Sequence, residues 1–337
     1  MTTRSRAEVG ARAMAEARLE AEDLAVSFPV AGGRTLRAVD GVSFRVGAGQ
    51  ILGVVGESGC GKTTAARCLA GLLAPDSGMV RLDGAPLGAR RTTSQRRAVQ
   101  MIFQDPYSSL NPRLTVRRML RELVAVHQLR PRDAIEERCR ELMGRVGLPA
   151  AALDGLPAQF SGGQRQRIAI ARALATEPLV LIADEPVSSL DVSVQATILR
   201  LFAELRDSLG LSIVIISHNL AVVRQLSDQV AVMYLGRIVE EGSTGELFGS
   251  VRHPYARALL AAAPRLHQRG LDRPDLRGEP PSPVDLPSGC RFHPRCPQAA
   301  GICQADPLLR PVRPASTHLV ACHFGADPDQ GAPAVSR

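Results

Sequence analysis

The segment GESGCGKTT at residues 56–64 constrains this chain more than any other feature of its sequence. Gly56, Gly61, Lys62 and Thr63 fit the pattern G-x-x-x-x-G-K-[ST], in which backbone N–H groups surround a polyphosphate. The 337 residues include 41 basic Lys and Arg residues, and Lys62 is the only lysine among them. A slim ammonium suits a tight loop better than the broad, planar guanidinium of arginine. Lys62 is therefore predicted to bind phosphate.

The surroundings of this loop agree with that prediction. The apolar run at 51–55 is typical of a buried strand, and residues 63–73 are predicted to form a helix. An ordinary glycine-rich turn would not need this strand–loop–helix order. The expected nucleotide contacts within the loop are Gly56, Ser58, Gly59, Cys60, Gly61, Lys62, Thr63 and Thr64. The Thr63 hydroxyl is expected to bind Mg²⁺, and Cys60 to be a partly exposed, alkylatable thiol without a catalytic role.

Composition limits the classes of protein to consider. Apolar residues make up 45% and charged residues 22%, which is ordinary for a globular chain. The net charge of +8 permits nucleic acid or an anionic membrane as a partner, but the arginines are spread along the chain. No apolar stretch approaches the ~18 residues that span a bilayer, and the N-terminus lacks the apolar segment of a signal peptide. We therefore expect a cytosolic protein whose seven cysteines are reduced.

Strand-like and helix-like segments alternate after the phosphate-binding loop at residues 56–64, which we call the P-loop. The apolar runs predict strands at 99–104, 179–185, 211–217 and 229–236, and helices near 192–209 and from 219. This alternation favours an α/β fold with a largely parallel sheet and helices on both faces. From residue 105 onward the sequence changes to helical stretches broken by Pro and Gly, which indicates an inserted helical subdomain.

A second phosphate-binding segment is predicted at FSGGQRQRIAIARAL, residues 160–174. Ser161, Gly162, Gly163 and Gln164 stand at the start of a predicted helix, where the N–H groups and the helix dipole attract phosphate. The chain thus has two such helix starts, about a hundred residues apart.

Two carboxylates follow at the end of the predicted strand 179–185. Asp184 and Glu185 should lie at the carboxyl edge of the sheet, where α/β proteins bind ligands. Asp184 is expected to hold Mg²⁺ through water, and Glu185 to polarise an attacking water. By itself such a pair is as often a surface feature, but the P-loop and the second phosphate segment favour the catalytic interpretation.

Together these residues resemble the ATP-binding-cassette (ABC) ATPases, from about residue 20 to 263. The resemblance implies that Gln104 is the Q-loop glutamine that touches Mg²⁺ and the attacking water, and that His218 contacts the γ-phosphate. It also implies that Asp191 lies at a dimer interface, and that Phe28 stacks on adenine, although Phe28 could instead be a core residue. Such ATPases pair head to tail, with ATP between the P-loop of one subunit and the SGGQ segment of the other.

The C-terminal part resembles the extension of ATPase subunits from oligopeptide, dipeptide and nickel importers. HPYARALLAAAPR at 253–265 and GEPPSPVDLPSGCRFHPRCPQAAGIC carry the resemblance, which implies a [4Fe–4S] cluster in some members. The candidate ligands are Cys290, Cys296, Cys303 and Cys322. Zinc and unligated thiols remain alternatives, and the C-x₂₋₄-C spacing usual for zinc is missing.

The predicted organisation is a P-loop ABC ATPase fold with an N-terminal β-subdomain, an inserted helical subdomain and a small Cys-containing extension. We expect a mobile extension at 1–20, the ATPase domain at 21–263 with its helical subdomain at about 105–175, the extension at 264–325 and a disordered tail at 326–337.

The predicted function is ATP hydrolysis that drives an importer of short peptides, nickel or related solutes. The expected partners are a homologous ATPase subunit, identical or not, two membrane permease subunits and, indirectly, an extracellular binding protein; the chain would lie on the inner face of the membrane. Residues 105–120 would receive the permease, through an apolar cup (Pro106, Tyr107, Leu110, Pro112) and a basic rim (Arg113, Arg117, Arg118). A soluble ABC ATPase acting on nucleic acid or ribosomes is the alternative; an exporter ATPase is a third.

Overall fold

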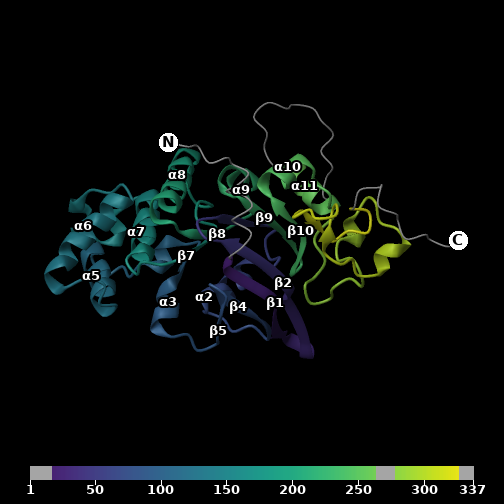
Figure 1. Cartoon of the computed structure of the whole chain (residues 1–337), viewed down its shortest axis with the longest axis horizontal. Coiled ribbons are helices and arrows are strands. Elements are labelled where there is room, and N and C mark those ends of the chain that lie inside the picture. Colours follow the sequence, from purple (N-terminus) through teal and green to yellow (C-terminus); the bar gives the residue numbers. More distant parts are fainter. Residues whose placement is uncertain (1–16, 263–277, 326–337) are drawn as a thin grey trace.

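The computed structural model describes residues 17–262 and 278–325, and Figure 1 shows their arrangement. A central sheet carries helices on both faces. The helical subdomain with α5 (Val116–Val126) and α6 (Ile135–Arg145) lies at one end, and the C-terminal extension lies at the other. The extensions predicted at 1–20 and 326–337, and the first part of the segment predicted at 264–325, fall wholly or partly outside the described residues.

The main sheet has eight strands in the order β11-β12-β10-β9-β3-β8-β7-β6. Its core, β9-β3-β8-β7-β6, is parallel, and β10 joins β9 in the antiparallel sense. The strands are β3 (Ile51–Val55), β6 (Val99–Ile102), β7 (Val180–Asp184), β8 (Ser212–Ser217), β9 (Gln229–Tyr234), β10 (Arg237–Ser243), β11 (Arg310–Pro311) and β12 (Leu319–Val320).

The continuous apolar runs of the parallel strands reflect burial on both faces. Ile51 packs in the core beneath the helical subdomain, whereas its neighbour Leu52 packs in the core beneath the β-subdomain. The same alternation separates Leu181 from Ile182. Because successive side chains of a strand point to opposite faces, only a sheet covered on both sides needs every residue apolar.

A second, four-stranded antiparallel sheet has the order β2-β1-β4-β5. Its strands are β1 (Ala17–Val30), β2 (Arg34–Gly47), β4 (Ser77–Leu82) and β5 (Ala85–Leu87). The turn Ala31–Gly33 joins β1 and β2 into a long hairpin. Since β1 begins at Ala17, the ordered fold includes residues 17–20, which the sequence assigned to a mobile extension.

Helices cover both faces of the main sheet (Figure 1). They are α2 (Lys62–Ala70), α3 (Thr93–Ala98), α4 (Pro106–Ser109), α5 (Val116–Val126), α6 (Ile135–Arg145), α7 (Gly162–Leu174), α8 (Val192–Leu209), α9 (Leu220–Leu226), α10 (Thr244–Gly249) and α11 (Pro254–Ala262), with short 3₁₀ turns between some of them. The elements α4 to α7 form the predicted helical subdomain. In the described parts of the chain, no helix combines the length and the apolar character needed to cross a bilayer.

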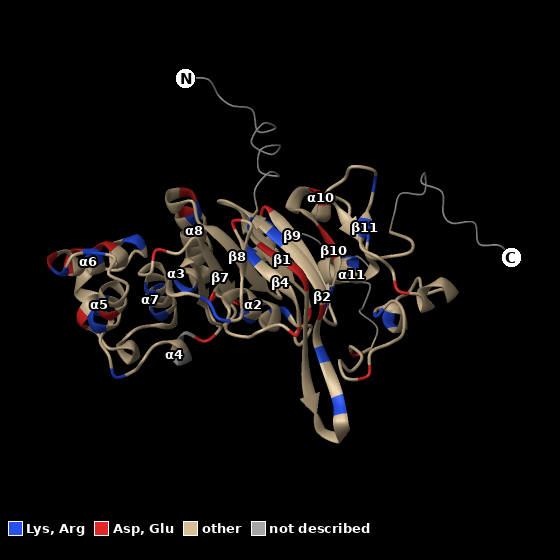
Figure 2. Ribbon diagram, turned by 60° about the horizontal axis from the view of Figure 1, so that its bottom comes forward, with Lys and Arg blue, Asp and Glu red and all other residues tan. Residues whose placement is uncertain are grey.

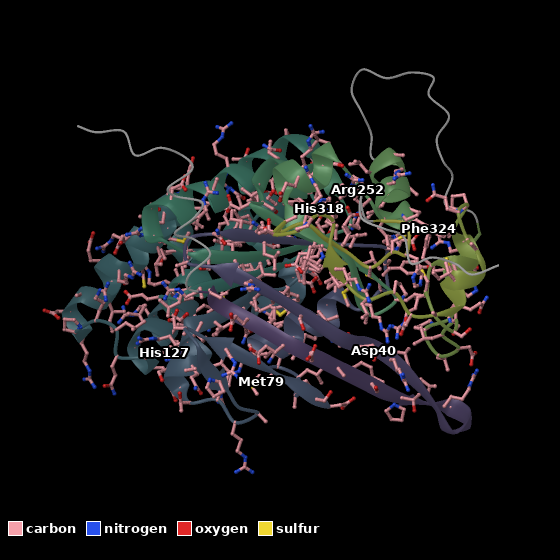
Figure 3. The ribbon with its side chains drawn as sticks, turned by 45° about the vertical axis from the view of Figure 1, so that its right-hand side comes forward. Asp40, Met79, His127, Arg252, His318 and Phe324 are labelled. Atoms are coloured by element: carbon pink, nitrogen blue, oxygen red, sulfur yellow. The ribbon has the colours of Figure 1, made fainter. Side chains whose placement is uncertain are left out.

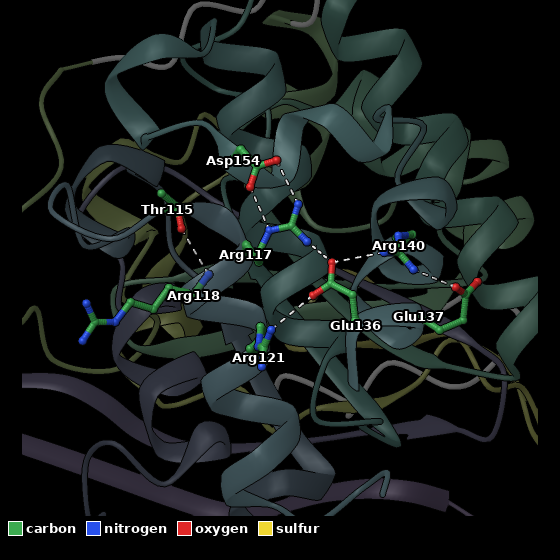
Figure 4. A network of polar contacts seen from close by, with 8 residues as sticks. All are labelled: Thr115, Arg117, Arg118, Arg121, Glu136, Glu137, Arg140 and Asp154. Atoms are coloured by element: carbon green, nitrogen blue, oxygen red, sulfur yellow. Dashed lines mark hydrogen bonds and ion pairs between the residues drawn. The ribbon is translucent and has the colours of Figure 1, made fainter. Parts of the chain in front are cut away.

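Charged side chains are intermixed rather than sorted by sign. Figure 2 shows basic and acidic segments side by side on α5 and α6, and Figure 4 shows several of them paired. The arginines of this part of the fold are therefore distributed among acidic residues and do not form a continuous basic surface.

The C-terminal extension is attached to the main sheet as additional strands. β12 pairs with β10 and β11 pairs with β12, so the chain returns to the sheet after a detour of some 75 residues. Glu240 of β10 is part of this joint, since it pairs with Val320. It is fully buried and accepts hydrogen bonds from the N–H groups of Arg252 (2.8 Å) and His253 (2.8 Å) and from Nε2 of His318 (2.7 Å). Arg252 and His318 lie near one another in Figure 3. This joint was not foreseen, since two-residue strands leave no pattern in a sequence.

Candidate active site

The P-loop connects β3 to α2 in a shape that only glycine permits at two positions. Gly56 and Gly61 have φ values of 159° and 103°. A Cβ atom on Gly56 would lie 2.1 Å from the carbonyl oxygen of Met233, and one on Gly61 would lie 2.0 Å from that of Ala38. Both contacts are with backbone atoms, so neither can be relieved by a side-chain rotation. The two motif glycines therefore allow the loop to pass close under β2 and β9.

Lys62 is the first residue of α2, and its side chain turns back into the loop. It is 5% exposed, and Nζ donates hydrogen bonds to the carbonyl oxygens of Gly56 and Glu57, both at 2.7 Å. Nζ also lies 3.6 Å from Sγ of Cys60. A compact ammonium can make these contacts from a narrow space, which accounts for a lysine in an otherwise arginine-only chain.

Cys60 differs from the expectation of a partly exposed thiol. Its side chain is 4% exposed and does not line the pocket described below. Burial raises the pKa of the thiol, although the Lys62 ammonium acts in the opposite direction. Cys60 is therefore a buried, protonated side chain that packs inside the loop, and any nucleotide contact from it would come from its backbone.

Thr63 and Asp184 meet between α2 and the end of β7. The Thr63 hydroxyl donates to Oδ1 of Asp184 at 3.2 Å, and Asp184 is 3% exposed. Burial raises the pKa of Asp184, and the bond from Thr63 partly offsets the rise. A carboxylate and a hydroxyl are oxygen donors of the kind that Mg²⁺ prefers, so this pair fits the predicted metal ligands.

Gln104, Glu185 and His218 converge from three neighbouring strands. They follow β6, β7 and β8, whose carboxyl ends meet at one edge of the sheet. Nε2 of Gln104 donates to Oε2 of Glu185 at 3.1 Å, and Nδ1 of His218 lies 3.1 Å from Oε1 of Glu185. Each oxygen of the Glu185 carboxylate thus has one partner.

The backbone at Glu185 is also unusual. Its φ is 46°, a left-handed conformation that is rare for a residue with a side chain, and its N–H donates to the carbonyl oxygen of Ile216 at 2.9 Å. Local strain of this kind costs about 1–3 kcal/mol and is concentrated at functional sites. Here it accompanies the turn that separates the buried Asp184 from the more accessible Glu185.

Several of these groups line one pocket of about 490 Å³, whereas the buried Asp184 lies behind Thr63 and is not among its lining residues. The lining residues are Phe28, Leu36, Ala38, Ser58, Gly59, Gly61, Lys62, Thr63, Thr64, Gln104, Glu185 and His218. Phe28 lies at the outer end of β1 and is 37% exposed, so it is not a core residue. Leu36 and Ala38 were not predicted, although β1 and β2 pair Phe28 with Leu36 directly. Counting outward from the Ala-Gly-Gly turn of this hairpin could have found Leu36.

The second phosphate segment is formed as expected but does not line this pocket. Ser161 is the N-cap of α7: its hydroxyl accepts from the N–H of Gln164 at 3.3 Å, and its own N–H donates to the Gln164 side chain at 2.9 Å. Ser161 and Gln164 are exposed, while Gly162 and Gly163 pack close to Leu190 and Val194. Asp191, the N-cap of α8, is exposed and is likewise outside the pocket.

The comparisons with known proteins identify the fold and the family. The model of the family "ABC transporter" matches residues 39–188, and that of the "Oligopeptide/dipeptide transporter, C-terminal region" matches 239–303. The chain is 47% identical over 93% of its length to the probable peptide ABC transporter ATP-binding protein y4tS of Sinorhizobium fredii, of which the alignment covers 91%. The chain belongs to the ABC transporter family. It is an ATPase of that family.

Other relatives agree with this assignment. The oligopeptide transport ATP-binding protein AppF of Bacillus subtilis is 44% identical over 91% of this chain and 97% of its own. The dipeptide transport ATP-binding protein DppF of Escherichia coli is 45% identical over 93% of this chain and 95% of its own. All three proteins are named as transport ATP-binding proteins, which favours the transporter interpretation over action on nucleic acid.

Solved structures show the same cassette. CbiO1 of Clostridium perfringens, part of the ABC transporter complex cbiONQ, has a TM-score of 0.62 and 30% identity, covering 69% of this chain and 91% of its own. The cassette MJ0796, solved as a dimer in a post-hydrolysis state bound to ADP and Pi, has a TM-score of 0.59 and 25% identity, covering 67% and 98%. The chain thus contains a cassette of ordinary size and a further part beyond it.

Some residues of the surface predicted to receive a permease are buried or form ion pairs with other residues of this chain. Leu110 is 2% exposed and packs in the core, so it does not belong to an exposed cup. Arg117 makes a bidentate pair with Asp154 (2.8 and 2.9 Å) and a further pair with Glu136, whereas Arg118 extends away from this network (Figure 4). The predicted apolar cup and basic rim are therefore smaller than the sequence indicated.

The four cysteines of the extension are free thiols, and three of them are half-buried. Burial raises the pKa of Cys290 to about 11, and the other three cysteines contribute to the rise because they lie in its neighbourhood. Among the residues described, however, no group of three or more His, Cys, Asp or Glu side chains is placed to hold a metal ion. As the side chains stand, they do not form the predicted metal centre.

Proposed function

We propose that this ATPase works as a head-to-tail dimer that drives the import of short peptides through a separate membrane permease. The observation that carries the proposal is the separation of the two phosphate-binding helix starts. The N-terminus of α2 lines the pocket, whereas that of α7 is exposed and outside it. A second cassette that supplies its own α7 would complete the site, and the dimeric structure of the related MJ0796 cassette supports this arrangement.

The residues that line the pocket, and Asp184 beside it, suggest a division of roles. Lys62 and the loop N–H groups would hold the β- and γ-phosphates, and Phe28 would stack on the adenine. Thr63 and Asp184, joined at 3.2 Å, would hold Mg²⁺ together with Gln104; the ion would neutralise charge that develops on the phosphates.

Glu185 would orient and polarise the attacking water. Its two carboxylate oxygens are held by Gln104 and His218, each at 3.1 Å, so its direction is set by groups that also face the nucleotide. Such positioning is the main means by which proteins catalyse phosphoryl transfer. When ATP is cleaved and the γ-phosphate leaves, the contacts that join the two cassettes are lost, and the dimer opens.

The surface near Gln104 is the proposed contact with the permease. Tyr107 is 62% exposed, although the guanidinium of Arg165 lies 3.6 Å from the centre of its ring, and Arg113 and Arg118 are exposed in the same segment of the chain. An aromatic ring with two arginines fits a short cytoplasmic helix that presents apolar and acidic side chains. Gln104 would link movement of this surface to the ATP site. The protein would then be peripheral to the inner face of the membrane.

The names of the relatives favour peptides over nickel as the transported solute, and both remain proposals. A partner ATPase of different sequence and a second copy of this chain are equally compatible with the intact motifs. The [4Fe–4S] cluster on Cys290, Cys296, Cys303 and Cys322 remains a prediction that the side-chain arrangement does not support. Iron, sulfide and zinc analysis of anaerobically purified protein distinguishes a cluster, a zinc site and unligated thiols.

Affinity purification of the full chain from detergent-solubilised membranes tests the transport proposal. We expect two hydrophobic permease chains and a second ATPase, or a second copy of this one, to be recovered with it. Recovery of ribosomal proteins or nucleic acid without any permease would contradict the proposal and leave only the ATPase activity.

A further inference from the structure

The second residue of the P-loop segment, Glu57, is held by side chains from the far end of the chain. Nη1 and Nη2 of Arg295 donate to the two carboxylate oxygens of Glu57 at 2.9 and 3.1 Å, which makes a bidentate pair. The backbone N–H of Glu57 donates to the hydroxyl of Tyr255 at 2.8 Å. These partners are 238 and 198 residues away in the sequence. Arg295 lies in the extension, and Tyr255 lies on α11, which leads toward it.

The two partners are themselves rigidly placed. Tyr255 is fully buried and packs against Tyr234, with ring centroids 4.5 Å apart, and against Phe292 of the extension at 5.5 Å. The Arg295 side chain is 5% exposed and also donates to the Tyr234 hydroxyl at 3.3 Å. The bond to Glu57 raises the pKa of the Arg295 guanidinium above its already high ordinary value. The guanidinium thus stays charged, and it cannot rotate away without disturbing the aromatic group.

On its other side, Glu57 is joined to the residue that would bind phosphate. Its carbonyl oxygen and that of Gly56 accept the two short bonds from Nζ of Lys62. The Glu57 side chain does not line the nucleotide pocket, and its N–H faces Tyr255 rather than the pocket. Glu57 therefore acts as a link: Arg295 holds its side chain and Tyr255 its N–H group, while Lys62 binds its carbonyl oxygen.

We propose that Arg295 and Tyr255 are positioning residues of the ATP site, through which the C-terminal extension sets the shape of the P-loop and the affinity for ATP. This role concerns the ATPase itself and holds whichever solute is transported. A loop whose conformation is fixed in advance binds its ligand without an ordering cost, so loosening the loop should weaken binding more than it slows the chemical step.

The alternative is that the contact merely fastens the extension to the cassette. Arg291 provides the control, because it is another buried arginine of the extension, 8% exposed, and it anchors to Asp40 and to the carbonyl oxygen of Leu235. Its partners are on β2 and just after β9, not in the P-loop. Arg291→Gln should therefore loosen the extension to a similar degree without acting on Glu57.

The experiment compares Arg295→Gln, Arg295→Lys, Tyr255→Phe and Arg291→Gln in the full-length protein, with kcat and KM for ATP and the thermal midpoint measured for each. We expect Arg295→Gln to raise KM roughly tenfold with kcat changed less than about twofold, the loss typical of one charge-assisted contact. Arg295→Lys should recover part of the loss, because it keeps the charge but not the bidentate geometry. Tyr255→Phe, which removes one oxygen and keeps the ring, should raise KM by roughly threefold.

Arg291→Gln should lower the thermal midpoint and leave KM within about twofold of the wild type. The proposal is overturned if Arg295→Gln and Tyr255→Phe lower the midpoint but leave KM unchanged, since the contact is then only a fastening. It is equally overturned if Arg291→Gln raises KM as much as Arg295→Gln does. Should Arg295→Gln fail to fold, Tyr255→Phe and Arg295→Lys still decide the question.

Discussion

Replacing Glu240 should detach the C-terminal extension from the main sheet. This carboxylate is fully buried and accepts from the N–H groups of Arg252 and His253 and from Nε2 of His318, at 2.7–2.8 Å. In Glu240→Ala, the buried N–H of His253 and Nε2–H of His318 lose their acceptor. An unsatisfied buried donor costs about 1–3 kcal/mol, so the two together should lower the free energy of unfolding by about 4 kcal/mol. Glu240→Gln keeps one acceptor oxygen and should cost about half as much.

Urea unfolding followed by circular dichroism measures this loss. With a slope of roughly 2 kcal/mol per molar urea, the midpoint of Glu240→Ala should fall by about 2 M. Glu246→Gln is the matched control: Glu246 accepts from Ser243 (2.7 Å) and Thr317 (3.2 Å) on the surface of the same region, and its replacement should cost less than about 0.5 kcal/mol. A loss below about 1 kcal/mol in Glu240→Ala, or an equal loss in the control, would refute the reasoning.

Two further predictions concern the P-loop. Gly61→Ala should abolish measurable ATP binding, because the new Cβ would lie 2.0 Å from the carbonyl oxygen of Ala38. Gly210→Ala is the control: its φ is 63° and the space around it is open, so it should cost only about 1 kcal/mol of stability and leave ATP binding intact. Equal ATP affinity of the two variants would contradict this prediction. Cys60 is buried, and burial raises the pKa of its thiol, so it should react with iodoacetamide at pH 8 more slowly than the half-buried Cys296. Mass spectrometry of the labelled peptides measures both rates. Faster labelling of Cys60 would show that its thiol is accessible.

Much of the cassette could be predicted because its signals are local or fixed by the sheet. The strand at 51–55 and the helix at 192–209 have the predicted bounds in the structure. Gln104, Glu185 and His218 were expected in one site, and they converge because each follows a parallel strand of the same sheet. Parallel strands place their carboxyl ends at one edge, so three positions far apart in sequence become neighbours once the strands are recognised.

The remainder depends on contacts that no local pattern encodes. The pairing of β12 with β10 involves two residues on each strand, and the bond between Arg295 and Glu57 spans most of the chain. Cys60 was expected to be partly exposed, but Lys62 and Gly56 lie against its sulfur. The sequence also could not show that Arg117 pairs with Glu136 and Asp154. An arginine on a helix surface looks the same in the sequence whether it is free or paired with an acidic residue farther along the chain.

The central claim is that ATP joins the P-loop of one cassette to the α7 N-terminus of another. Its most direct test is the mass in solution of Glu185→Gln, which should bind Mg²⁺ and ATP but hydrolyse it very slowly. Measured by light scattering, alone and with the ATPase recovered from membranes, this variant should form a dimer only when ATP is present. Adding Ser161→Asp keeps a good N-cap but places a negative charge against the phosphate, and the dimer should then be lost while each cassette still binds ATP. Two results would contradict the account: an ATP-dependent dimer that persists in the presence of Ser161→Asp, or a Glu185→Gln variant that binds ATP but stays monomeric both alone and with the ATPase recovered from membranes.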